Sequence, residues 1–203
     1  MKRIFGLAVM ILSIAAAHAG EKDKRFSPPP ADSFATRQTQ GGVTIAAVPY
    51  VAEDDIKAAF GKANPPKYGI LPVLVIIQND SGKALRLNLQ AEYVDPDGKH
   101  IEAVPPGDVM YAGKSPKRPN INPTPLPLPR SSGKGPLAVW EIEGRAFSAR
   151  MLPAGESVNG FFYFETKLQP GSKLYLTGLG EAQTGKELFY FEIPLDSKTE
   201  PRP

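Results

Sequence analysis

Few side chains in this sequence are of the types that catalyse reactions or bind metals. Apart from His18 near the N-terminus, His100 is the only histidine, and the chain has no cysteine. A Ser-His-Asp triad would have to use His100, but no G-x-S-x-G elbow is present to hold the serine. A zinc site needs several His, Cys or carboxylate ligands at fixed spacing. We therefore expect no metal and no cofactor, and we expect His100 to be a surface residue beside a turn.

The carboxylates do not form a recognisable catalytic or calcium-binding pattern. "DPDG" at 95–98 begins like a calcium loop but is followed by Lys99 and a predicted strand, so it is read as a hairpin turn. Asp54 and Asp55 fall in the first turn of a predicted helix, where they favour the helix dipole. Glu141 and Glu143 are expected on the wet side of a strand. "GLGEAQTG" connects strands and opens no helix, so it binds no phosphate. We predict that the protein is not an enzyme.

The N-terminus has the layout of a secretory signal peptide. Lys2 and Arg3 precede an apolar run from Ile4 to Ala17, and Ala17-His18-Ala19 forms a small-x-small cleavage site. The run is shorter than the roughly 20 residues of a spanning helix. We expect residues 1–19 to be removed and the protein to be periplasmic or secreted. Without cysteine there is no lipid anchor and no disulfide, so a hydrophobic core must hold the domain together.

The charge of the mature chain argues against nucleic acid as a partner. Without Lys2 and Arg3, the 24 basic residues of the full sequence fall to 22, against 21 acidic ones. Nucleic-acid binding needs a dense basic face, so we expect none.

Between the termini, strand patterns dominate. Residues 69–79 are apolar on both faces, as in a central strand, and residues 85–93 alternate between apolar and polar. Further strands are predicted at 43–51, in "KHIEAV", "LAVWEIE", "AFSARML" and "VNGFFYFE", and in a last pair, "KLYLTGL" and "ELFYFEIPL". One short helix is predicted at 53–61. Residues 20–42 read as a flexible spacer and 196–203 as a disordered tail. The prediction is one all-β, immunoglobulin-like β-sandwich over 43–195, with about seven to nine strands.

A proline-rich, basic segment occupies residues 113–136. It would be a linker only if each half of the chain filled its own sandwich, and neither half has enough strands. We therefore read it as a long loop of one domain. Its apolar and basic residues either pack on the protein's own surface or dock a partner; they include Lys117, Arg118, Leu126, Leu128 and Arg130.

The C-terminal strands carry more aromatic residues than one core face needs. Phe161, Tyr163, Tyr175 and Tyr190 are expected on an outer sheet face. A bare patch of that size would be a binding surface or an aggregation hazard. We expect it to be covered by the proline-rich loop, by the helix at 53–61 or by a partner protein.

Two segments resemble the bacterial telokin-like immunoglobulin domains of exported proteins and lipoproteins. One is "LPVLVIIQNDSGKALRLNLQAEYVDPDGKHIEA", in which a strand ends at Asn79 and a hairpin closes at the D-x-D-G turn. The other is "LPAGESVNGFFYFE". The resemblance covers roughly 70–104 and 152–195 and omits the helix and the proline-rich loop. It implies a binding, scaffolding or accessory module, and it brings no catalytic residues.

The sequence thus predicts a non-catalytic accessory module of the bacterial envelope. It would contact an unknown envelope protein through its outer sheet face or proline-rich loop, with Lys117, Arg118, Leu126, Leu128, Arg130, Tyr163, Tyr175 and Tyr190 as the interaction surface. The alternative is a carrier or sensor of a small apolar or glycan ligand at the C-terminal aromatic strands. A ligand carrier would need a pocket of several hundred cubic ångströms there.

Overall fold

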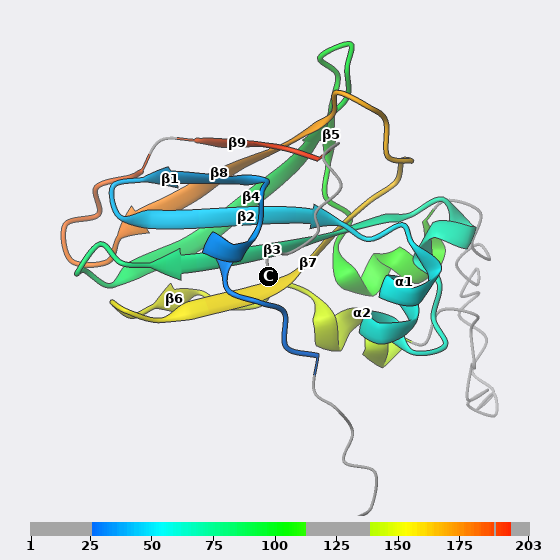
Figure 1. Cartoon of the computed structure of the whole chain (residues 1–203), viewed down its shortest axis with the longest axis horizontal. Helices are drawn as coiled ribbons and strands as arrows, with labels where there is room; N and C mark the ends of the chain where they lie inside the picture. The colour runs from blue at the N-terminus through cyan, green and yellow to red at the C-terminus, as the bar shows by residue number, and fades with distance from the viewer. Residues whose placement is uncertain (1–25, 113–138, 189, 196–203) are drawn as a thin grey trace, which may run out of the picture.

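A computed structural model describes residues 26–112, 139–188 and 190–195, which form two antiparallel β-sheets packed face to face (Figure 1). The first sheet has the order β1-β2-β3-β7, and the second has the order β5-β4-β8-β9, with β6 also paired to β4. The strands within these residues are β1 (Arg37–Gln40), β2 (Val43–Pro49), β3 (Leu71–Asn79), β4 (Leu85–Val94), β5 (His100–Glu102), β6 (Met151–Leu152), β7 (Ser157–Phe164), β8 (Lys173–Glu181) and β9 (Phe191–Pro194). The all-β sandwich and its strand number are confirmed; the immunoglobulin-like assignment stays a prediction.

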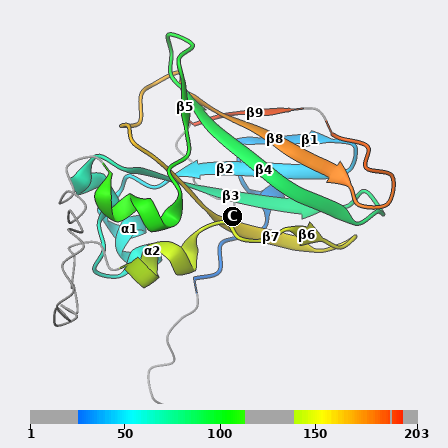
Figure 2. The same cartoon turned by 180° about the vertical axis from the view of Figure 1, so that it is seen from behind.

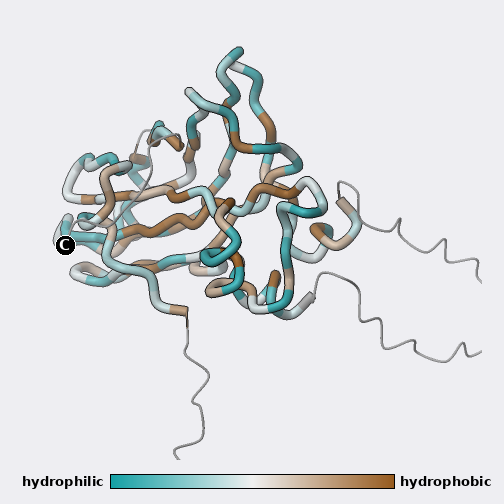
Figure 3. The backbone as a smooth tube through the Cα atoms, turned by 45° about the vertical axis from the view of Figure 1, so that its right-hand side comes forward, coloured by the Kyte–Doolittle hydropathy of each residue, from teal (hydrophilic) through white to brown (hydrophobic). Residues whose placement is uncertain are grey.

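The hydrophobic pattern explains where the central strands lie. β3 is buried on both faces because one face packs against the second sheet and the other is covered by helices. β4 alternates as predicted, with Leu85, Leu87 and Tyr93 turned into the core between the sheets. Figure 3 shows hydrophobic stretches running along the strands, whereas the tip of the β4–β5 hairpin is hydrophilic.

That hairpin tip is the turn predicted from "DPDG". The Asp95 carboxylate accepts hydrogen bonds from the backbone N–H of Asp97 at 3.0 Å and of Lys99 at 2.8 Å. Gly98 has a φ of 82°, which side-chain-bearing residues rarely adopt. The aspartate thus bonds the turn's own backbone. Over the ranges the structure describes, no group of three or more metal-ligating side chains occurs.

A second core lies on the outer face of the first sheet, where α1 (Glu53–Phe60) and α2 (Val139–Arg145) lie side by side (Figures 1 and 2). Short 3-10 turns add to this cover: η1 (Ala31–Ser33), η2 (Pro65–Tyr68) and η3 (Pro106–Tyr111). Phe60 of α1 packs on Phe161 of β7, with ring centroids 4.7 Å apart. We call this cluster the helix-covered core. Neither α1 nor α2, nor any other helix of the described part, is long and apolar enough to cross a membrane.

The helix-covered core removes Tyr163 from the expected interaction surface. Phe161 and Tyr163 do face away from the sandwich interior, but they are 1% and 0% exposed. The predicted helix covers them, joined by α2 and η3. Cover by the chain itself was one of the expected arrangements. Tyr163 is therefore a core residue and not part of an interaction surface.

The prediction of a strand at "LAVWEIE" is wrong, because residues 139–145 form α2. Its alternating pattern fits a strand, but Ile142 is buried against the helix-covered core and its carbonyl accepts a bond from Tyr163. Tertiary packing overrides the weak local preference for a strand. Glu141 and Glu143 accordingly lie on a helix and not on the wet side of a strand. The predicted strand "AFSARML" is reduced to β6 and one bridge at Ala146.

Part of the predicted flexible spacer at 20–42 is also folded. Phe34 is buried in the helix-covered core, Phe26 packs against it, and β1 pairs with β2. Gly41 and Gly42 have φ values of 59° and 77°, as a two-residue hairpin turn requires. The sandwich thus begins before Val43. The predicted signal peptide at 1–19 and the tail at 196–203 lie outside the described residues.

Removing the Tyr163 hydroxyl should weaken the packing of α2. The hydroxyl donates a hydrogen bond of 2.8 Å to the carbonyl of Ile142, and burial raises the tyrosine pKa. Tyr163→Phe leaves that buried carbonyl unpaired, which costs about 1–2 kcal/mol. Urea denaturation measures the change, with the exposed Tyr190→Phe as a control that leaves stability unchanged. Equal stability of Tyr163→Phe and wild type would contradict this packing.

Tyr50 should make stability fall at alkaline pH. Burial, and secondly the negative charge of Asp55, raise its pKa from 10.0 to about 12. Between these values the unfolded tyrosine loses its proton while the folded one keeps it, so stability falls as pH rises. We expect urea midpoints to fall over that range and to fall less steeply in Tyr50→Phe. Parallel pH profiles for the two proteins would show that Tyr50 contributes nothing.

Candidate functional site

On one side of the sandwich the chain crosses between the two sheets twice. After β5, in the second sheet, the chain reaches the first sheet, where the Val104 N–H donates to the Tyr163 carbonyl at 2.7 Å. After α2, Ala146 pairs with Phe161 of β7, and the Phe147 N–H donates to the Phe161 carbonyl at 3.0 Å. The chain then returns to the second sheet as β6. The two crossovers leave the side wall open between them.

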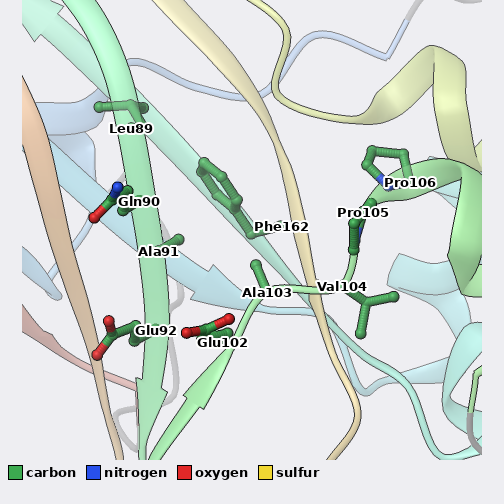
Figure 4. A pocket seen from close by; sticks show the side chains of 10 residues that line it. All are labelled: Leu89, Gln90, Ala91, Glu92, Glu102, Ala103, Val104, Pro105, Pro106 and Phe162. Carbon is green, nitrogen blue, oxygen red and sulfur yellow. The ribbon is translucent and has the colours of Figure 1, made fainter.

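The opening is a groove between the edges of β4 and β7 (Figure 4). It has two adjoining parts, each of about 390 Å³, which share Leu89, Gln90 and Phe162. One part continues along the crossover after β5, and the other along the crossover before β6. We call it the lateral groove. Its apolar lining includes Leu89, Ala103, Phe147, Ala149 and Phe162.

The edge of β4 is open in the middle of this groove. Among the described strands, β6 pairs with Leu85 and Arg86, and β5 pairs with residues 92–94. The crossovers extend this pairing slightly, since the Leu87 N–H donates to the Arg150 carbonyl and the Ala103 N–H to the Ala91 carbonyl. Residues 88–90 therefore have no strand partner on this side within the described ranges.

Aromatic side chains form the floor of the groove. Phe162 lies between β4 and Ala103 in Figure 4, and Phe147 stacks on it with centroids 5.5 Å apart and planes at 13°. Both rings remain partly exposed. The close crossover depends on Gly160, where an added Cβ would lie 2.4 Å from the Cα of Phe147. The sequence placed Phe162 in a strand with Phe164 and gave no sign that a groove exposes it, because the segments that frame the groove are distant in the chain.

Charged side chains lie at the two ends of the groove. Glu92 and Glu102 face each other across β4 and β5 at one end, and Arg150 lines the other. Glu92 binds the Nδ1 atom of His100 at 2.5 Å, which makes His100 a surface partner of a carboxylate. The two carboxylates lie directly opposite each other, which is unfavourable for like charges on a sheet. With Arg150 at the opposite end, the groove has an apolar middle, an acidic end and a basic end.

The predicted surface residues that the structure describes do not form one site. Lys117, Arg118, Leu126, Leu128 and Arg130 lie outside the described residues. Tyr163 is buried under the helices. Tyr175 and Tyr190 do meet, on the outer face of the second sheet, with ring centroids 5.3 Å apart and planes at 29°. The predicted aromatic set is thus divided between the two sheets.

Comparisons with known proteins add little to this geometry. No protein-family model matches the sequence. No curated protein matches it either. A solved structure, the X-ray structure of Northeast Structural Genomics Consortium target SoR45, is similar at a TM-score of 0.34 and 12% identity, covering 77% of this chain and 88% of that chain. A likeness this low carries no argument about function.

Proposed function

We propose that this protein is an exported, non-catalytic module that binds an apolar stretch of another envelope protein in the lateral groove. The observation that carries the proposal is the groove itself, in which Leu89, Phe147 and Phe162 remain partly exposed between two crossovers. Sandwich interiors are normally closed by such side chains packing together. An apolar opening on an otherwise polar rim is typical of a binding site.

The form of the groove favours an extended peptide as its occupant. The free edge of β4 at residues 88–90 presents backbone groups to a chain lying along it, as in β-strand addition. Alternate side chains of such a chain would point down onto Leu89 and Phe162. Each apolar side chain that becomes fully buried contributes about 1.5–3 kcal/mol. Glu102 and Arg150, at opposite ends, would give the bound chain a preferred direction.

Export is the second half of the proposal. It rests on the leader pattern of residues 1–19. Because the chain has no cysteine, an exported domain would have to be held together by its core alone. The sandwich has two apolar clusters of the kind such a domain needs. A periplasmic or secreted accessory module would meet its partner outside the cytoplasm.

The proposal is tested by filling the groove without disturbing the fold. Ala103→Trp places an indole in the part of the groove next to the β5 crossover, where Ala103 points inward (Figure 4). Val51→Trp is the matched control, because Val51 is already exposed and does not line the groove. The probe is a random linear peptide library displayed on phage. We expect selected peptides to alternate apolar residues and to bind Ala103→Trp at least about tenfold more weakly.

Two results would overturn the groove as the binding site. One is the recovery of no peptide that binds the wild-type chain. The other is equal binding to wild type and Ala103→Trp once both are shown to unfold at similar temperatures. Peptides that lose affinity for Val51→Trp instead would place the site beside α1.

A carrier of a small apolar molecule is the second candidate. It is favoured by one observation, the groove volume, since each part lies within the few hundred cubic ångströms of ligand pockets. In that case a fluorescent apolar dye would bind wild type but not Ala103→Trp, in which the indole fills the groove. The peptide library would then yield no binders.

A further inference from the structure

The outer face of the second sheet carries a further, polar pocket, which shares Asn88 and Gln90 with the edge of the lateral groove. It has a volume of about 250 Å³ and lies over β4 and β8. Its lining includes Arg86, Asn88, Gln90, Thr177 and Glu187. We call it the bulge pocket.

A β-bulge and two glycines create this pocket. The pairing of β4 with β8 jumps from Leu87–Leu179 to Gln90–Thr177, so that two residues of β4 oppose Gly178. Gly178 has a φ of 85°, and an added Cβ would lie 2.0 Å from the Asn88 carbonyl oxygen. Gly180 also lines the pocket. Where a regular sheet would carry side chains, this face is hollow.

The polar side chains around the pocket have unused hydrogen-bonding capacity. Within the described ranges, the side chains of Asn88, Gln90 and Thr177 make no hydrogen bond to the protein, and Arg86 has no ion-pair partner there. Amides and hydroxyls both donate and accept. Arg86 and Glu187 on the rim carry opposite charges, so the pocket as a whole favours neither an anion nor a cation. This set of groups fits an uncharged ligand rich in hydroxyls.

An aromatic platform lies next to the pocket on the same face. Tyr175 is two residues from Thr177 along β8, so both side chains point outward. Tyr190 stacks on Tyr175 and is 50% exposed. The His100 ring meets Tyr175 edge-on with centroids 5.7 Å apart. The Tyr190 ring, half-exposed and held in place by stacking on Tyr175, offers a flat apolar surface beside the side-chain amides of the pocket.

We propose that this face binds an uncharged pyranose ring of an oligosaccharide. The apolar C–H face of the sugar would lie against Tyr190, and its hydroxyls would bond to Asn88, Gln90 and Thr177. A pyranose ring has flat apolar faces and carries hydroxyls around its rim. The tyrosine platform complements the apolar face, and the polar pocket complements the hydroxyls. The inference goes beyond the proposed groove function, because the lateral groove opens at the side of the sandwich and this pocket lies on a sheet face.

The test is a titration of the full mature chain, followed by NMR amide shifts, with cellotetraose, maltotetraose and the tetramer of N-acetylglucosamine. These three probes distinguish glucan sources from an amino-sugar source. We expect at least one of them to give saturable shifts on β4 and β8. Tyr190→Leu should weaken binding about tenfold or more, whereas Tyr190→Phe should retain it. Trp140→Leu, which removes a more exposed aromatic residue on α2, is the control and should bind normally.

The proposal fails if none of the three sugars shifts these amides at concentrations up to about 10 mM, beyond the millimolar affinity class. It also fails if Tyr190→Leu binds as tightly as wild type, or if the shifts map to Ala103 and Phe147, which line the lateral groove and not the bulge pocket. Ala103→Trp, which blocks the groove, should leave sugar binding unchanged. That variant separates failure of this inference from failure of the groove proposal.

Discussion

Gly178→Ala is expected to lower the free energy of unfolding by roughly 3 kcal/mol or more, which is at or above the upper end of the range for most point mutations. Two costs combine at this position. The φ of 85° strains any residue with a Cβ, and that Cβ would lie 2.0 Å from a backbone oxygen of β4. Backbone atoms cannot swing aside as a flexible side chain can. The bulge would have to rearrange, and with it the pairing of β4 and β8 at the centre of the second sheet.

Gly185→Ala separates the two costs. Gly185 lies in the turn after β8 with a φ of 68°, but an added Cβ there meets nothing within 4 Å. Gly185→Ala should therefore be destabilised only by the strain of the left-handed backbone, which costs about 1–2 kcal/mol. Chemical denaturation of both variants gives the comparison. If Gly178→Ala is no less stable than Gly185→Ala, the close approach of β8 to the bulge is not present in solution.

Asn79→Ala is expected to cost about 3 kcal/mol, because one buried amide joins three parts of the chain. Its Nδ2 donates to the carbonyls of Lys83 at 2.8 Å, Pro153 at 2.9 Å and Leu152 at 3.1 Å. Its Oδ1 accepts from the Ser81 hydroxyl at 2.6 Å and from the Ser81 N–H at 3.2 Å. The alanine variant loses these hydrogen bonds and opens a space where the β3–β4 turn meets the end of β6.

The controls for Asn79 use chemistry that is close to its own. Asn79→Asp keeps the shape but replaces the donating nitrogen by an oxygen that faces carbonyls, so it should be at least as unstable as the alanine variant. Asn88→Ala, at an exposed asparagine of β4, should change stability by less than about 0.5 kcal/mol. A denaturation curve for Asn79→Ala that overlies wild type would mean that water replaces the whole set of bonds.

The elements best predicted from the sequence are those whose burial is set by neighbours on both sides. β3 is apolar throughout and β4 alternates, and both lie where the pattern placed them. The helix at 53–61 was equally readable, since its acidic first turn and Gly61 mark its ends. In these segments, local preference and tertiary environment agree.

The errors arise where tertiary contacts decide. Residues 139–145 alternate like a strand, but the outward-facing aromatic side chains of β7 offer them a surface on which about two helical turns pack. Residues 26–42 read as a polar spacer, although Phe26 and Phe34 are the side chains that fill the helix-covered core. The Gly41-Gly42 pair was a usable hairpin signal.

The candidate site could not be predicted from local patterns. The lateral groove exists because Val104 and Phe147, far apart in sequence, both donate hydrogen bonds to β7, at Tyr163 and Phe161 on either side of Phe162. The alternating pattern of β7 correctly predicts two pairs on opposite faces of the strand: Phe162 with Phe164, and Phe161 with Tyr163. It could not show that Phe164 would be closed over while Phe162 stayed partly open. Likewise, Tyr175 and Tyr163 share a pattern but belong to different sheets.

The most direct test of the groove is photo-crosslinking in the native cell. A benzoylphenylalanine at Ser148, on the exposed rim next to β6, would react with whatever lies in the groove, and the same group at Thr184, in the turn after β8, is the control. We predict a single envelope protein joined to position 148, through an apolar segment identified by mass spectrometry, and loss of this adduct when Ala103→Trp fills the groove. The same adducts from both positions, or an adduct that survives Ala103→Trp, would contradict the account.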